Sequence, residues 1–148
     1  MKGDKMDTVA AVAKIEARKS AQEFSESQKT HREKLAQLEQ LIQFKEDYER
    51  SFNARSSEGM DARQLQDYRL FLSRLNEAIA QQSSEIQGSE QNLQASRDEW
   101  VSKTQRNQAL DQLVEDRHRE RLRAREKLEQ KRLDDDSLAR GGHNDPEQ

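Results

Sequence analysis

Residues 65–100 read LQDYRLFLSRLNEAIAQQSSEIQGSEQNLQASRDEW, and this stretch decides the fold. Large apolar side chains recur in it at every seventh position: Leu65, Leu72, Ile79, Ile86, Leu93 and Trp100. The repeat continues in the same phase through four more positions, of which two are polar: Asn107, Val114, Arg121 and Leu128. A seven-residue repeat sustained over about nine heptads predicts a long helix that buries a narrow seam against another helix. A helix of a compact globule is far shorter and carries a wider apolar face.

The composition excludes an ordinary globular core. Of the 148 residues, 31% are hydrophobic and 37% are charged, and the mean hydropathy is -1.27. Such a chain is either disordered or built from long helices, and the sustained heptads favour helices. Glycine and proline break helices, and Pro146 and the pair Gly141-Gly142 lie in the last eight residues, where they interrupt nothing. We therefore predict an all-α protein.

Net charge and residue usage exclude several classes of function. The net charge is -3 and the pI is about 5.7, so bulk charge does not indicate a nucleic-acid partner. The chain has no cysteine, which excludes disulfides and thiol chemistry. It has no run of about 18 apolar residues that could span a membrane, and no apolar signal-peptide core follows Lys2 and Lys5. We expect a cytoplasmic protein.

The first half of the chain predicts a second long helix, over about residues 5–54. Its first third is rich in alanine and only weakly periodic, whereas its last third carries a clear apolar stripe: Leu38, Leu41, Tyr48 and Phe52. A loop over about residues 55–61 follows, where Ser56, Ser57 and Gly59 cluster. Asp61 to Gln64 then resembles a capping box, which would begin a helix over about residues 62–138.

Two helices joined by a short break become antiparallel neighbours. If the chain folds about Met60, core positions of the two helices face each other in four pairs: Phe52 with Tyr68, Tyr48 with Leu72, Leu41 with Ile79, and Ser20 with Trp100. A parallel dimer of chains would use the same seam but would leave the break unexplained. We predict one monomeric antiparallel two-helix coiled-coil domain over residues 1–139, with a disordered tail over residues 140–148.

In this register the first residues of the first helix lie opposite about Glu115, so the rest of the second helix overhangs as a single helix. The overhang begins with the basic run Arg117 to Lys127, RHRERLRAREK, and ends near the acidic run Asp134 to Asp136. One interpretation is a solvated face with Glu–Arg pairs four residues apart. The other is a site for an acidic partner, which is favoured by four apolar residues on the same segment: Leu122, Leu128, Leu133 and Leu138. A DNA-binding basic zipper has the opposite order of basic region and heptads.

The sequence contains no motif that carries catalysis or metal binding. The histidines His31, His118 and His143 lack the spacing of metal ligands, and His31 falls on a core position as a tolerated polar residue. No phosphate-binding loop or nucleophile turn occurs. We expect no enzymatic activity, no catalytic residue, no cofactor and no metal. Trp100 is expected to fill the seam rather than to act as a surface hot spot, whereas Phe71 either covers the seam or forms an exposed contact.

Several stretches resemble the FliJ family, the cytoplasmic stalk proteins of the flagellar type III export apparatus. The first are Leu38-x-x-Leu41-x-x-Phe44, Tyr48-Glu49 and the loop with Gly59. The others are Tyr68-x-x-Phe71-x-x-x-Leu75-x-x-Ala78-Ile79-x-x-Gln82, Arg97-x-x-Trp100 and Glu129-Gln130-Lys131-x-x-Asp134-Asp135. Their order and spacing cover about residues 35–139, and together they are more specific than any one of them.

The resemblance implies a coiled coil similar to the central stalk of rotary ATPases, which binds the hexameric export ATPase and promotes its assembly and activity. The residues implied to bind the ATPase ring are Arg117, Arg121, Arg125, Lys127 and Lys131. Those implied to contact the cytoplasmic domain of the export gate protein are Phe71, Leu75, Ala78 and Gln82. Relatives carry histidine at the last of these positions. The resemblance also implies binding and recycling of export chaperones, and peripheral association with the inner membrane through the export apparatus.

Two alternatives share this pattern. The equivalent stalk protein of a virulence injectisome would have the same shape, but the match over Tyr68–Gln82 favours the flagellar machine. A plain structural coiled-coil scaffold would also carry the heptads, and it would be a parallel dimer rather than an elongated monomer.

Overall fold

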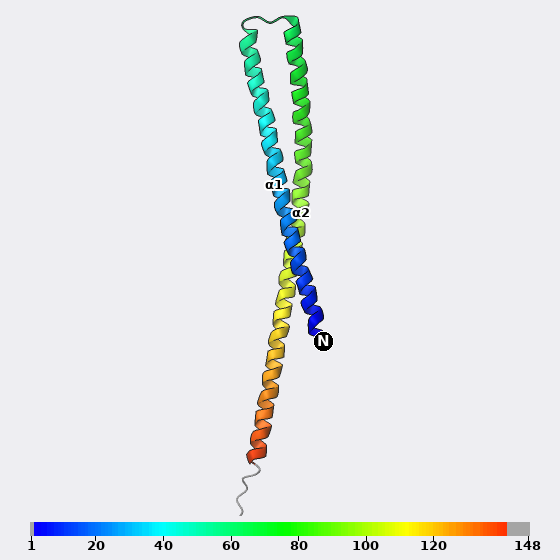
Figure 1. The fold of residues 1–148 in the computed structure, drawn as a ribbon, viewed down its shortest axis with the longest axis vertical. Coiled ribbons are helices and arrows are strands. Elements are labelled where there is room, and N and C mark those ends of the chain that lie inside the picture. The colour runs from blue at the N-terminus through cyan, green and yellow to red at the C-terminus, as the bar shows by residue number, and fades with distance from the viewer. Residues whose placement is uncertain (1, 142–148) are drawn as a thin grey trace, which may run out of the picture. The chain divides into compact units, whose positions relative to one another are not determined.

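The computed structural model describes residues 2–141, and it gives side chains from Lys5 onward. Two helices make up almost all of this part of the chain: α1 over Lys2–Ser56 and α2 over Ala62–Gly141 (Figure 1). The described residues contain no strand, so the predicted all-α fold of two long packed helices is confirmed. The described residues divide into two compact units, which we call the hairpin unit (residues 17–102) and the terminal unit (residues 2–16 and 103–141).

Both helices run a little further than the periodicity predicts. α1 begins at Lys2 and ends at Ser56, and α2 begins at Ala62, as expected, but continues to Gly141. Residues 140 and 141, which were assigned to a disordered tail, are therefore helical. The remainder of that tail, residues 142–148, lies outside the described residues, and the assignment of residues 1–139 to a single domain stays a prediction.

A capping box starts α2, as its sequence predicts. The Gln64 backbone N–H donates to Asp61 Oδ1 at 2.8 Å, and the Asp61 backbone N–H donates to Gln64 Oε1 at 3.3 Å. Gly59 in the preceding turn has φ 101°, a left-handed conformation that glycine adopts without steric cost. The turn is therefore set by local chemistry before any contact between the helices forms.

Aromatic stacking fixes the antiparallel register of the hairpin unit near the turn. The rings of Phe52 and Tyr68 stack with centroids 3.6 Å apart and an interplanar angle of 13°, which confirms the predicted pairing. Tyr48 lies 5.2 Å from Tyr68 and 4.4 Å from Phe71, so four rings form one cluster on both helices. Such ring pairs contribute about 0.5–1.5 kcal/mol each beyond the area they bury.

Trp100 fills the seam at the other end of the hairpin unit. Its ring stacks on Phe24 with centroids 5.4 Å apart and an interplanar angle of 10°. Phe24 lies one helical turn beyond Ser20, the residue placed opposite Trp100 by the register. The offset follows from helix geometry, because every side chain leans toward the N-terminus of its own helix. In an antiparallel pair this lean brings Trp100 and Phe24 toward each other.

Polar side chains in the middle of this seam are satisfied across it. His31 Nδ1 and Ser89 Oγ lie 2.7 Å apart, and the Ser89 hydroxyl also donates to the Ile86 carbonyl at 2.9 Å. The Gln82 amide donates to the Lys34 carbonyl at 2.9 Å. The interpretation of His31 as a polar seam residue is therefore confirmed. These bonds link specific positions of α1 and α2, so they add register specificity to the apolar packing.

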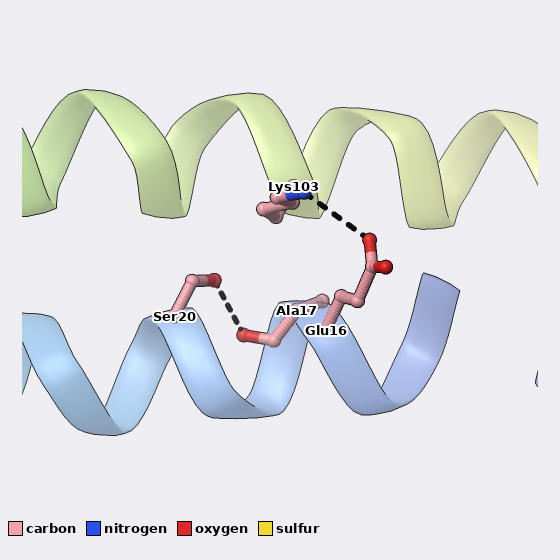
Figure 2. Close-up of polar contacts among 4 residues, drawn as sticks. All are labelled: Glu16, Ala17, Ser20 and Lys103. Carbon is pink, nitrogen blue, oxygen red and sulfur yellow. Dashed lines mark hydrogen bonds and ion pairs between the residues drawn. The ribbon is translucent and has the colours of Figure 1, made fainter. Parts of the chain in front are cut away.

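The seam of the terminal unit is built from small residues. Ala10 and Ala13 on α1 are buried, and the α2 positions at the same heptad spacing are half-buried: Lys103, Asn107, Leu110 and Val114. Lys103 Nζ also forms an ion pair with Glu16 Oε2 at 3.2 Å (Figure 2). The alanine-rich start of the chain thus packs along a seam. Its periodicity looks weak in the sequence because alanine is only weakly hydrophobic.

Tyr68 makes the stability of the ring cluster dependent on pH. Burial, then the negative charge of Glu49 and then that of Tyr48, raise the pKa of Tyr68 above its ordinary value of 10.0. A raised pKa in the folded state favours the neutral phenol, so its contribution to stability is complete below about pH 10 and is lost as the pH rises through the folded-state pKa. We expect the thermal midpoint measured by circular dichroism to fall more steeply above about pH 10 in the natural chain than in Tyr68→Phe. Equal slopes for the two proteins would contradict this assignment.

Candidate partner-binding surface

The C-terminal part of α2 is a single exposed helix. Val114 is its last half-buried residue, and every residue from Glu115 to Gly141 is exposed. We call residues 115–141 the overhang. Its four leucines are 45–75% exposed, in rising order Leu122, Leu133, Leu128 and Leu138. The heptad register predicts this arrangement, because α1 has no residues left to cover α2 beyond this point.

The basic residues predicted to bind the ATPase ring all lie on the overhang and are exposed: Arg117, Arg121, Arg125, Lys127 and Lys131. Among the side chains that the structure describes, those of residues 5–141, none of these five forms an ion pair, and the overhang carries one pair, Arg119 with Glu115 at 2.8 Å. The alternative interpretation, a helix face lined with regular Glu–Arg pairs, therefore fits only one turn of the overhang. The other guanidinium and ammonium groups keep their hydrogen-bonding capacity available for an external anion.

Arg117 and Arg121 line a shallow depression at the start of α1. Its volume is about 160 Å³, and the residues that form it come from both helices of the terminal unit: Met6, Asp7, Val114, Arg117, His118 and Arg121. Arg117 and Arg121 occupy the next two seam positions after Val114. Charged residues thus replace apolar ones at the point where the partner helix begins, and this change marks the boundary between paired and single helix.

The four residues predicted to contact the export gate do not share one exposed face. Phe71 is 37% exposed and packs on Tyr48, and Ala78 is exposed. Leu75 is only 6% exposed and lies in the seam, while Gln82 is half-buried and bonded to α1. The sequence contains this information, because Leu75 falls seven residues after Tyr68 and seven before Gln82, in a second heptad line parallel to that of Leu65.

Phe44 is a surface residue of the same cluster that sequence reasoning did not assign to a site. Its ring lies edge-on to Phe71 with centroids 6.0 Å apart, and it is about half exposed. An open depression of about 530 Å³ adjoins the cluster at the turn, lined in part by Tyr48, Phe52 and Tyr68. The turn end of the hairpin unit therefore presents aromatic surface from both helices. Its signal in the sequence is the local density of aromatic residues between positions 44 and 71.

The described residues contain no group of three or more His, Asp or Glu side chains arranged to hold a metal ion. Neither α1 nor α2, over the part that is described, is apolar enough along its length to cross a membrane. The features that stand out are exposed side chains: an unpaired basic helix with leucines, and an aromatic surface near the turn. These features define an antiparallel helical-hairpin protein with two exposed surfaces, one basic and one aromatic, that other proteins can contact.

The comparisons with known proteins identify the family of this hairpin. The family described as the flagellar FliJ protein matches residues 1–144. The flagellar FliJ protein of Escherichia coli (strain K12) is 27% identical over 128 residues, which are 86% of this chain and 87% of that protein. The chain belongs to the FliJ family, as the motifs between residues 35 and 139 predict. Membership supports a role related to flagellar protein export.

Proposed function

We propose that this chain is a stalk-like, non-enzymatic component of flagellar type III protein export. In this proposal it binds the hexameric export ATPase, promotes the assembly and activity of the ring, and couples the ring to the export gate. The observation that carries the proposal is the overhang, a continuous exposed helix on which Arg119 alone among the basic residues forms an ion pair with a described side chain. A helix of this kind is suited to insertion among surrounding subunits.

Charge and geometry support the ring as the site of the overhang. Residues 117–127 contain six Arg or Lys and two Glu, so the segment is strongly basic although the chain is acidic overall. Arg117, Arg121 and Arg125 follow one another at four-residue spacing, which places them on one helix face. The remaining arginines of the run lie on other faces. Contacts of different strength around the helix would bias the surrounding subunits differently, as a stalk does.

The aromatic surface near the turn supports a separate contact with the cytoplasmic domain of the gate protein. Phe71 and Ala78 supply its exposed part, whereas Leu75 is buried in the seam and the Gln82 amide donates a hydrogen bond to the Lys34 carbonyl of α1. Aromatic residues in a partly exposed, well-packed setting are frequent hot spots of protein interfaces. The two proposed contacts thus use different units of the chain.

Family resemblance supports three further parts of the proposal. The chain would bind and help to recycle export chaperones, would act as a monomer in the cytoplasm, and would associate with the inner membrane only through the export apparatus. No cofactor and no nucleic acid takes part. The match to the flagellar FliJ family favours this role over the injectisome stalk and over a plain scaffold.

A pull-down of the purified chain with the export ATPase tests the central contact. We expect stable co-purification, and a higher rate of ATP hydrolysis with the chain present than without it. Sedimentation of the free chain distinguishes the stalk from the scaffold, because a stalk is expected to be a monomer and a scaffold a parallel dimer. An ATPase that neither binds the chain nor responds to it would exclude the stalk role.

Replacement of Phe71 by alanine tests the gate contact. We expect the affinity for the cytoplasmic domain of the gate protein to fall about tenfold or more, because an aromatic anchor is lost. Binding to the ATPase should stay unchanged. Leu70→Ala is the matched control, since Leu70 is the adjacent exposed apolar residue of α2 and points to another face. Isothermal titration gives the affinities, and circular dichroism gives the helicity. If Phe71→Ala lost helicity together with gate affinity, the role of Phe71 would be structural and the gate contact would not be supported.

A further inference from the structure

The first turns of α1 are held on α2 by small side chains. We call residues 2–16 the α1 arm. Its buried residues are Ala10 and Ala13, the latter 3% exposed, and Met6 is half-buried. The other large apolar residues of the arm are exposed: Val9, Val12 and Ile15, the last of them 65% exposed. The arm is docked, but most of its large apolar side chains lie on the exposed face and bury little area against α2.

The hairpin unit is held much more strongly. All five ring contacts of the described residues lie within it, from Phe24–Trp100 at one end to Phe52–Tyr68 at the other. Hydrophobic stabilisation is roughly proportional to the apolar area removed from water, and an alanine removes far less than a stacked ring. Each helical turn of the arm is therefore stabilised less by packing than each turn of the hairpin unit.

Asn107 adds a penalty that is specific to the docked arm. It lies at a seam position of α2, and its Oδ1 atom is buried with no hydrogen-bond partner among the described residues. A buried acceptor without a partner costs the desolvation energy of that group. If the arm leaves α2, water reaches this oxygen and the penalty disappears. The buried Asn107 oxygen therefore disfavours docking of the arm, although it lies in the middle of the docked interface.

The ion pair between Glu16 and Lys103 closes the inner end of the arm at 3.2 Å. Their side chains are 40% and 32% exposed, so solvent screens the attraction and the pair is a weak tether. It also lies at the boundary of the hairpin unit. The arm can consequently open up to this point without disturbing the stacked rings.

We propose that the α1 arm is a releasable segment, which undocks from α2 as a unit, with its hinge near Glu16, while the hairpin unit stays folded. Opening uncovers the seam side of α2 over residues 103–114, which continues directly into the overhang. The exposed single-helix surface of α2 then starts about three turns earlier. This device does not depend on the identity of any partner, so it stands apart from the proposed export role.

Hydrogen exchange of the full chain, read residue by residue by NMR, tests the proposal. We expect the amides of residues 6–16 to exchange through local opening, and therefore faster than those of residues 24–52. Asn107→Leu removes the unpartnered oxygen, so it should slow exchange in the arm about tenfold or more and leave residues 24–52 unchanged. Asn92→Leu, the same change at an exposed position of α2, is the matched control for helix propensity and should not affect the arm.

A covalent lock gives an independent measurement. The chain has no cysteine, and positions 13 and 107 face each other in the register that pairs Phe52 with Tyr68. An Ala13→Cys, Asn107→Cys disulfide should suppress exchange in the arm, and reduction should restore it. The proposal is overturned if the arm of the natural chain is protected as strongly as residues 24–52. It is also overturned if neither Asn107→Leu nor the disulfide changes exchange in the arm.

Discussion

A chain that ends at Glu115 is expected to leave the export ATPase at its basal rate, whereas we expect the natural chain to stimulate it. The truncation removes the overhang after Glu115 and with it every basic residue that we assign to the ring. It does not touch a buried residue, because all of the removed residues that are described are exposed. Stimulation is measured as ATP hydrolysis at rising concentrations of each chain, with circular dichroism to establish that both helices persist. If full stimulation survived, insertion of this end into the ring would be excluded.

A charge-reversal variant separates the charge of the overhang from its length. In Arg117→Glu, Arg121→Glu, Arg125→Glu the helix keeps its full length, and we expect the concentration for half-maximal stimulation to rise about tenfold or more at low salt. The matched control makes the same change in net charge on the exposed surface of the hairpin unit: Arg63→Glu, Arg69→Glu and Arg74→Glu. An equal effect of both triple variants would indicate a response to net charge alone rather than to a ring site.

Replacement of Trp100 by alanine is expected to give the largest loss of stability of any single change in the hairpin unit. The substitution removes the ring stacked on Phe24 and leaves a gap in the seam between α1 and α2. Large-to-small changes of buried aromatic residues cost about 3–5 kcal/mol, and because Trp100 is half-buried we expect about 2 kcal/mol. Urea unfolding followed by circular dichroism measures the free energy directly.

Trp100→Phe is the control for this change, because it keeps a ring against Phe24 and should recover most of the loss. Leu138→Ala gives the baseline change in unfolding free energy for loss of an exposed leucine, since Leu138 is 75% exposed on the overhang. Its free energy of unfolding should stay within about 0.5 kcal/mol of that of the natural chain. A similarly small effect of Trp100→Ala would show that the stack contributes nothing to the pairing of the helices.

The heptad line from Leu65 predicts a long helix packed along a narrow seam, and the break at residues 55–61 favours the first half of the same chain as the partner helix. The capping box at Asp61 and the pairing of Phe52 with Tyr68 followed from local spacing and from the position of the turn. The role of Ala10 and Ala13 could not be read in the same way. Alanine is common on every face of a helix, so its periodicity carries little signal until a partner helix shows which face is buried.

The candidate site was less predictable than the fold for a physical reason. Seam residues are constrained by contacts within the chain, whereas the five basic residues assigned to the ring form no ion pair with any described side chain that could define their role. Leu75 lies in the seam while Phe71 lies partly exposed beside it, because residues four apart on a helix need not lie on the same side of a narrow seam. Its burial follows only when both heptad lines of α2 are traced together.

The five residues that separate α1 from α2 also determine the order in which the chain can fold. Phe52 and Tyr68 are close in the sequence, so the loop that joins them closes at small entropic cost, whereas Glu16 and Lys103 are 87 residues apart. Contacts between near residues form early and shorten the loops for later ones. The hairpin is therefore expected to nucleate at its turn and to zip toward the chain ends, with the alanine seam closing last.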